Sequence, residues 1–225
     1  MLQRSRQGHT RPPRSEPALT QRASFFGPMP TTELILIRHG ESQWNLEGRW
    51  QGQADPPLTE RGRSQARDAV WRIACMEAVA LYSSSLRRAH ETARILGRRI
   101  GLEPQVEPRL REFNVGVWSG LTKPEIEQRW PGQYARFSFR ELDFRPGGGE
   151  SPRELMARVH EALDEIADRH AGQRVLLVSH GGVAKSLSGV GLENLGALHL
   201  RRGESGRWEP TNGATPIASV RQEAL

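Results

Sequence analysis

Residues 34–40 read Leu-Ile-Leu-Ile-Arg-His-Gly, and this stretch decides the fold class. Four consecutive Leu and Ile residues, bounded by Pro30 upstream and Gly40 downstream, predict a buried strand. In open α/β sheets, ligands bind beyond the carboxyl ends of such strands. We therefore expect Arg38 and His39 to project into a crevice, where Gly40 lets the backbone come close to a ligand.

The second half of the chain repeats this arrangement. Residues 175–178 read Val-Leu-Leu-Val and run directly into Ser179-His180-Gly181-Gly182. One histidine after a strand is more often a cap of the strand end than a reactive group. Two strands that both end in His-Gly are harder to explain in this way, and we expect the imidazoles of His39 and His180 to face one site.

The length and composition fit a single α/β domain. A chain of 225 residues can bury a substantial core, and no apolar stretch reaches the length of a membrane span. Cys75 is the only cysteine, so an intrachain disulfide is excluded and a cytoplasmic location is favoured. We expect the domain to occupy residues 31–208, followed by a loose tail over residues 209–225.

The net charge of +6 is unevenly distributed along the chain. Residues 1–30 contain five arginines and one glutamate, a net of +4, which leaves only +2 for residues 31–225. The basic leader is rich in Pro, Gln and Ser, and we expect it to be disordered; translation could also begin at Met29. Because the basicity belongs to the leader, it gives little support to a role in binding nucleic acid.

Strands and helices are expected to alternate, as in a three-layer α/β/α domain with a mostly parallel central sheet. The stretch from Leu121 to Pro146 has no clear period and is either an insertion over the site or a loosely packed cover. The expected elements are a helix capped by Thr59, a strand at residues 79–82, a helix capped within Ser83–Ser85 and running to Ile100, a strand at 105–110, a helix opened by the capping box Ser151-Pro152-Arg153-Glu154, and a last strand near 196–200.

A histidine that attacks phosphorus needs cations for the phosphoryl oxygens and a proton donor for the leaving oxygen. Arg38 lies beside His39, and Arg88 falls in the first turn of a predicted helix, where the helix dipole also favours an anion. Glu112 follows a predicted strand, so its carboxylate could reach the crevice. Taken alone, a glutamate in such a place is more often a surface charge.

The segment Arg38-His39-Gly40-Glu41-Ser42-x-Trp44-Asn45 resembles the signature of the histidine phosphatase superfamily, the group that includes cofactor-dependent phosphoglycerate mutases. The likeness covers about residues 33–200 in the family's order. It continues through Gln51-Gly52, Asp55, Pro57-Leu58-Thr59, Gly62, Gln65-Ala66, Ser83-Ser84-x-Leu86-x-Arg88-Ala89-x-x-Thr92-Ala93, Leu110-Arg111-Glu112, Gly116, Trp118, Gly120, Gly147-Gly148-Gly149-Glu150-Ser151 and Ser179-His180-Gly181-Gly182.

The resemblance implies a phosphoglycerate mutase-like fold and a role for each matching residue. His39 becomes the nucleophile that forms phosphohistidine, and Glu112 protonates the leaving group and then activates water. Phosphoryl oxygens are bound by cationic groups, so no metal ion or other cofactor is implied. The implied oxygen-binding and substrate-binding residues are Arg38, Arg88, a protonated His180, Asn45, Gln51, Ser42 and Gly181.

Within the family, hydrolysis and phosphoryl transfer have to be separated. Mutases carry a longer basic and aromatic insert after the glutamate segment, whereas here Glu112 leads into Phe113–Gly120 and soon afterwards into Pro146–Ser151. This layout favours a phosphatase that acts on small phosphorylated metabolites. A mutase is the alternative, and a non-catalytic module that binds phosphorylated ligands is a third, although every catalytic position is filled.

One departure from the family concerns the segment after His180. The helix expected over Val183–Ser188 is at most two turns long, because Gly189, Gly191 and Asn194-Leu195-Gly196 follow almost at once. A covering layer of the sheet is therefore expected to be missing there. Exposed apolar surface on that flank predicts either a homo-oligomer or low thermal stability.

Overall fold

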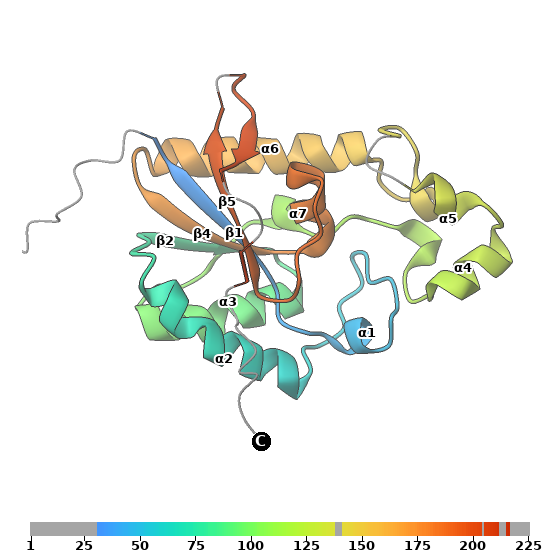
Figure 1. Ribbon diagram of the computed structural model, residues 1–225, viewed down its shortest axis with the longest axis horizontal. Coiled ribbons are helices and arrows are strands. Elements are labelled where there is room, and N and C mark those ends of the chain that lie inside the picture. Colours follow the sequence, from blue (N-terminus) through green and yellow to red (C-terminus); the bar gives the residue numbers. More distant parts are fainter. Residues whose placement is uncertain (1–30, 138–140, 204, 212–214, 217–225) are drawn as a thin grey trace, which may run out of the picture.

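The structure, a computed structural model, describes residues 31–137, 141–203, 205–211 and 215–216 (Figure 1). The basic leader and the greater part of the expected tail lie outside these residues. Among the residues that the structure describes, no helix is both long enough and apolar enough to cross a membrane.

A mixed sheet forms the centre of the domain, with the strand order β3-β2-β4-β1-β5-β6 and with β7 also paired to β5. Strands β1, β2, β3 and β4 pair in parallel, whereas β5 runs antiparallel to β1, β6 and β7. The strands are β1 Glu33–Arg38, β2 Ala80–Ser83, β3 Gln105–Val106, β4 Arg174–Ser179, β5 Gly196–Arg202, β6 Trp208–Pro210 and β7 Thr215–Pro216.

Helices cover both faces of the sheet, which confirms the predicted three-layer α/β/α fold (Figure 1). Side chains alternate along β1, so Leu34 and Leu36 pack on one face and Ile35 and Ile37 on the other. The first face is covered by α6 (Pro152–Arg169) and α7 (Gly181–Ser188), and the second by α2 (Glu60–Ala74) and α3 (Arg87–Ile100).

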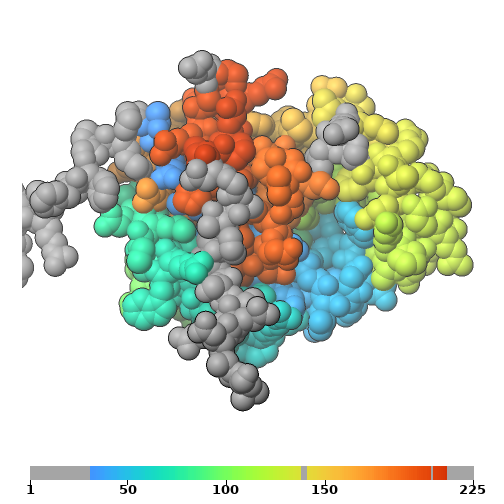
Figure 2. All heavy atoms as spheres, in the orientation of Figure 1, coloured from blue at the N-terminus to red at the C-terminus, as the bar shows by residue number. Residues whose placement is uncertain are grey.

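The irregular stretch 121–146 is a packed cover at one end of the domain (Figure 2). Its aromatic residues Trp130, Tyr134, Phe137 and Phe144 pack against the core cluster on the α6 face. The remaining short elements are α1 (Gln43–Leu46), α4 (Lys123–Arg129), α5 (Gln133–Arg136) and the 3-10 helices η1 (Pro108–Leu110), η2 (Gly116–Trp118) and η3 (Pro146–Gly148).

Two predicted element boundaries are wrong. The strand expected over residues 105–110 ends at Val106, because Pro108 has no N–H for a ladder and opens the 3-10 helix η1 instead. Helix α3 is not capped by a serine: its N-cap residue is Leu86, and Ser84 Oγ accepts the Leu86 N–H at 3.2 Å. The Thr59 cap and the Ser151 capping box are confirmed.

The tail expected from residue 209 contains the end of β6, which begins at Trp208, and the whole of β7; both strands pair with β5. Trp208 begins β6 and is only 3% exposed, because it packs into the core beneath α6 and donates its indole N–H to Asp164 at 2.9 Å. The expected tail is therefore wrong at β6 and β7, and β5 is not the last strand.

The helix after His180 is short, as expected, but the flank beside it is not bare. Helix α7 has eight residues, and the apolar side chains of the neighbouring strands β1 and β4 are fully buried. Leu192 and Leu195, from the segment that follows α7, are also buried, each in the core of a different face. Val190 in the same segment is 56% exposed, and the expected self-association stays a prediction.

Candidate active site

The two His-Gly turns meet because β1 and β4 are adjacent parallel strands in register. Arg38 pairs with Ser179, so the two strands end at the same level of the sheet. His39 donates its backbone N–H to Ser179 O at 3.0 Å, and its ring lies 5.2 Å from the His180 ring, centroid to centroid. Both side chains are buried. The expectation that the two imidazoles share one place is confirmed.

The hydrogen bonds of His39 determine which ring nitrogen can attack. Nδ1 lies 2.6 Å from Gly40 O, and because a carbonyl can only accept, Nδ1 carries the hydrogen of the neutral ring. Nε2 then accepts a hydrogen bond from Arg88 Nε at 3.2 Å, and its lone pair is released for attack when that N–H turns to a phosphoryl oxygen. Burial, reinforced by the charges of Arg88 and Arg38, holds the His39 pKa well below its usual value. The imidazole is therefore neutral and nucleophilic at physiological pH.

Arg88 is the fixed cation of the site. It is the second residue of α3 and fully buried, and its two terminal nitrogens donate to Ala54 O at 2.7 Å and to Gly52 O at 2.9 Å. Burial lowers the Arg88 pKa to about 10, which still leaves it charged at neutral pH. Two backbone carbonyls thus hold this guanidinium with its remaining edge toward His39.

His180 presents an unused hydrogen-bond donor. Ser84 Oγ accepts the Leu86 N–H and lies 2.8 Å from His180 Nε2. When the serine hydroxyl donates to Nε2, the ring hydrogen of His180 is on Nδ1. His180 Nδ1 is buried and has no hydrogen-bond partner among the described residues. A buried polar group without a partner is uncommon, and an incoming phosphoryl oxygen would supply the acceptor.

The resemblance implies a protonated His180 beside a phosphate, whereas the surroundings of the ring in the protein alone favour the neutral form. Burial comes first and the positive charge of Arg88 second in holding the His180 pKa well below its usual value, so the ring is neutral. It can still donate one hydrogen bond from Nδ1. A dianionic phosphate beside the ring would raise this pKa.

Arg38 is held by the segment that follows the short α7. One terminal nitrogen of Arg38 donates to Leu192 O, while the buried Nε has no partner in the described part of the chain. From the same segment, Asn194 Nδ2 donates to His39 O at 2.9 Å, and Leu195 N donates to Arg38 O at 3.0 Å. Our sequence analysis missed these contacts, because a carbonyl and a loop asparagine give no pattern in the sequence.

Ser42 lies behind two amides rather than in the pocket. Its hydroxyl is 2.8 Å from Gln51 Oε1 and 3.1 Å from Asn45 Oδ1, so both amide oxygens face the protein. The NH₂ groups of Asn45 and Gln51 remain as donors, and both residues line the pocket. The structure thus places Asn45 and Gln51 where the sequence predicted and gives Ser42 the task of orienting them.

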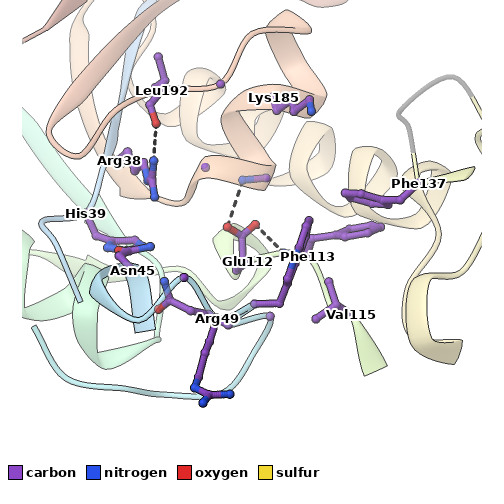
Figure 3. A pocket seen from close by; sticks show the side chains of 17 residues that line it. Arg38, His39, Asn45, Arg49, Glu112, Phe113, Val115, Phe137, Lys185 and Leu192 are labelled. Atoms are coloured by element: carbon purple, nitrogen blue, oxygen red, sulfur yellow. Dashed lines mark hydrogen bonds between the residues drawn. The ribbon is translucent and has the colours of Figure 1, made fainter. Parts of the chain in front are cut away.

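Glu112 reaches the same pocket between two backbone donors. Its Oε1 accepts the Phe113 N–H at 2.7 Å, and its Oε2 accepts the Gly182 N–H at 3.0 Å at the start of α7 (Figure 3). A Cβ atom on residue 182 would lie 2.3 Å from Glu112 Oε1, so any side chain there would displace the carboxylate from this position. The second glycine of the His-Gly-Gly turn is thereby explained by its contact with Glu112.

The pocket has a volume of about 310 Å³, which suits a small metabolite. Figure 3 shows Arg38, His39 and Asn45 on one side of Glu112 and an apolar wall on the other. Arg88 and His180 lie behind His39 and do not line the empty pocket. The lining residues that were not predicted from the sequence include Arg49, Trp50, Phe113, Val115, Phe137, Lys185 and Leu192.

The arrangement combines a neutral imidazole nucleophile, fixed guanidinium groups, two unused buried donors and a carboxylate across the pocket. These are the functional groups that an enzyme needs to transfer a phosphoryl group through a histidine. Among residues 31–137, 141–203, 205–211 and 215–216, no group of three or more His, Cys, Asp or Glu side chains is placed to hold a metal ion.

Comparison with known proteins identifies the family to which the chain belongs. The chain belongs to the histidine phosphatase superfamily (branch 1), whose family model matches residues 34–216. It is 40% identical over 158 residues to phosphoglycerate mutase-like protein 4 of Arabidopsis thaliana, a match that covers 69% of each chain. It is 41% identical over 159 residues to the metal-independent phosphoserine phosphatase of the same plant, covering 69% of this chain and 67% of that protein.

A solved structure shares the fold at similar identity. A mycobacterial glucosyl-3-phosphoglycerate phosphatase, described as a complex with VO3, superposes with a TM-score of 0.72 at 33% identity. The match covers 81% of this chain and 99% of the mycobacterial one. The resemblance found in the motifs therefore extends over the whole domain.

Proposed function

We propose that this protein is a metal-independent phosphomonoesterase that works through a phosphohistidine on His39. The observation that carries the proposal is the lone pair of His39 Nε2, which faces the bound Arg88 guanidinium beside the unused donors of Arg38 and His180. A phosphate placed there would accept hydrogen bonds from these donors. The nucleophile is already neutral and aimed at the same place.

In the first step, Nε2 of His39 attacks phosphorus and the bond from phosphorus to the ester oxygen breaks. Glu112, in its protonated form, gives its hydrogen to the departing oxygen, so that an alcohol leaves and phosphohistidine remains. The charge on the phosphoryl oxygens is balanced by the Arg38 and Arg88 guanidinium groups. His180 Nδ1 and the amides of Asn45 and Gln51 donate further hydrogen bonds.

The second step reverses these roles. The Glu112 carboxylate takes a proton from a water molecule, the water oxygen bonds to phosphorus, and the bond from phosphorus to Nε2 breaks. Inorganic phosphate leaves, and both His39 and Glu112 return to their starting forms. One carboxylate thus serves as acid and then as base, which agrees with its single position across the pocket.

We further propose small phosphorylated metabolites as the substrates. The pocket volume of about 310 Å³ supports this class, and relatives are named for phosphoserine and for glucosyl-3-phosphoglycerate. Other relatives are named as phosphoglycerate mutases or mutase-like proteins, so phosphoryl transfer between two positions of a substrate is the alternative activity. The exposed, unpaired Cys75 supports work in a reducing compartment such as the cytoplasm.

The test is a screen for phosphate release in the presence of EDTA. Phosphoserine, glucosyl-3-phosphoglycerate, 3-phosphoglycerate and p-nitrophenyl phosphate are incubated with the protein, and both free phosphate and rearranged phosphoester are measured. We expect phosphate release without rearrangement and without loss on chelation. Rearranged ester in place of phosphate would make the protein a mutase, and activity abolished by EDTA and restored by a divalent ion would contradict the metal-free mechanism.

A further inference from the structure

The motif Gly147-Gly148-Gly149-Glu150-Ser151 does not line the catalytic pocket, so the proposed mechanism gives it no task. Its backbone packs directly against the segment that follows Glu112. A Cβ atom on residue 147 would lie 2.3 Å from Val115 O, and one on residue 149 would lie 2.1 Å from Asn114 O. Glycine is required at both positions for this backbone contact.

Glu150 connects the motif to helix α6 through an ion pair with Arg158. Arg158 Nε lies 2.6 Å from Glu150 Oε1, and its Nη2 lies 2.9 Å from Glu150 Oε2. The pair is largely shielded from water, since the two side chains are only 20% and 12% exposed. Glu150 Oε2 also accepts the Asn114 N–H at 3.2 Å, and Glu150 N donates to Asn114 O at 2.8 Å.

Arg158 uses its other hydrogens on the backbone around Glu112. Its Nη1 donates to Arg109 O at 2.6 Å and to Arg111 O at 2.8 Å, while its Nη2 also donates to Glu112 O at 3.1 Å. Three carbonyls within four residues thus converge on one guanidinium. The Glu112 carbonyl is met from another direction by Gln53 Nε2 at 3.2 Å.

We propose that Glu150 and Arg158 are positioning residues that hold the Glu112 backbone so that its carboxylate reaches the ester oxygen. This inference rests on the proposed function, because it assumes that Glu112 transfers the proton. Neither residue lines the pocket, and their hydrogen bonds reach it through the backbone around Glu112. The charge of Arg158 also lowers the pKa of His180, so Arg158→Lys, which keeps that charge, separates the two effects. A displacement of about 1 Å can cost about 100-fold in a step that depends on orientation.

A purely structural role would give a different pattern of rates. If Arg158 only stabilised the fold, its loss would slow all substrates alike. If it positions Glu112, esters with poor leaving groups will suffer most, because p-nitrophenolate departs with little help from an acid. The ratio of kcat/KM for p-nitrophenyl phosphate to kcat/KM for an alkyl phosphate therefore reports the position of the Glu112 carboxylate.

The experiment measures this ratio for Arg158→Met, Arg158→Lys and Glu150→Gln in the full chain. We expect Arg158→Met to slow the alkyl ester by about 10-fold to 100-fold and p-nitrophenyl phosphate by less than about 3-fold. Arg158→Lys keeps the charge but has fewer donors, so it should lie between Arg158→Met and the wild type. Added to Glu112→Gln, Arg158→Met should cost little more, because both substitutions remove the same proton transfer.

Arg174→Met is the matched control. Arg174 is also half-buried, pairs with the buried Glu33 at 2.6 Å and donates to Met76 O, but it lies at the far end of β4 from the site. It should lower the melting temperature without changing the ratio. Equal slowing of both esters by Arg158→Met and Arg158→Lys, or full additivity with Glu112→Gln, would overturn the inference. The proposed function is judged separately, by phosphohistidine trapped on the same variants.

Discussion

The two ends of the pocket are built in different ways. At the phosphate end, His39 lines the pocket and Arg88 and His180 lie behind it; the three residues follow strand ends or begin a helix, and all are buried. At the leaving-group end, Trp50 and Phe137 come from connecting segments and are only partly buried. The chemistry is therefore fixed by the sheet, whereas the groups that meet the rest of the substrate belong to the cover of the domain.

The residues proposed to carry out the reaction are therefore different from those that meet the rest of the substrate. The phosphate end cannot change without disturbing strands β1 and β4, which form the middle of the sheet. The other end rests on ring contacts such as Trp50 to Phe137 at 5.2 Å and Phe113 to Phe137 at 5.6 Å, centroid to centroid. Side chains there can be exchanged while the sheet stays intact, so relatives of one family can act on different esters.

His39→Ala should give the largest effect, because it removes the nucleophile from the phosphate end. Another hydrolase loses about 10⁶-fold in kcat when its nucleophile is removed, and we expect a loss on that scale. Phosphate release and acid-labile label on the protein should both disappear, while the circular dichroism spectrum stays that of the wild type. Wild-type turnover by this variant would show that another group attacks phosphorus.

Glu112→Gln tests the group that stands between the two ends. General acid–base assistance is typically worth about 10²-fold to 10⁴-fold, and we expect losses in this range for alkyl phosphates. p-Nitrophenyl phosphate should lose far less, since its leaving group needs little protonation. Measurement of kcat/KM for both esters decides the matter, and equal losses would leave Glu112 with a structural role only.

The buried histidines of the phosphate end should make stability depend on pH. Both pKa values are lowered by burial, so below about pH 6.5 the unfolded chain binds protons that the folded protein does not. Stability is then complete above pH 6.5 and is lost as the pH falls, by up to about 1.4 kcal/mol per pH unit for each histidine.

Urea unfolding at pH 7, 6 and 5 measures this loss. His39→Asn and His180→Asn should each flatten the dependence, because asparagine does not titrate. Lys185→Met, a change at the leaving-group end, should leave the slope as it is. A free energy of unfolding that stays constant between pH 7 and pH 5 would mean that both rings take up protons in the folded state.

Phe137→Leu should have the smallest effect, confined to the leaving-group end. The smaller side chain keeps part of the apolar wall, so KM for the preferred ester should rise by about 3-fold to 10-fold with kcat nearly unchanged. Inhibition by inorganic phosphate, which needs only the phosphate end, should not change. If phosphate inhibition weakens together with substrate binding, the two ends are not independent.

The sequence predicted the phosphate end far better than the other. Arg38, His39, Arg88 and His180 could be placed because short periodic patterns identify strand ends and helix starts, and parallel strands align those ends. The motif resemblance added Glu112, whose position as a lone charge indicated little. Their local geometry was not predictable: the neutral state of His180 follows from its burial, which only the fold creates.

The leaving-group end could not be predicted, because its residues come together through long-range packing. Trp50 contacts Tyr134 and Phe137, which lie more than 80 residues further along the chain. Hydrophobic periodicity in the sequence reports only local structure and does not indicate such contacts. The same limit explains the wrong tail. Trp208, the last residue of the expected domain, begins β6, and the pairing of β6 with β5 brings Glu209 and Pro210 of the expected tail into the sheet.

The position of β1 in the sheet also has a consequence for the order of assembly. Strand β1, which carries the nucleophile at its end, pairs with β4 and β5, and both begin after residue 173. Before these strands are synthesised, β2 and β3 are the only pair that the described strands can form. The nascent chain must therefore keep the apolar strand β1 without a partner through most of translation, and closure of so long a loop makes the final docking slow.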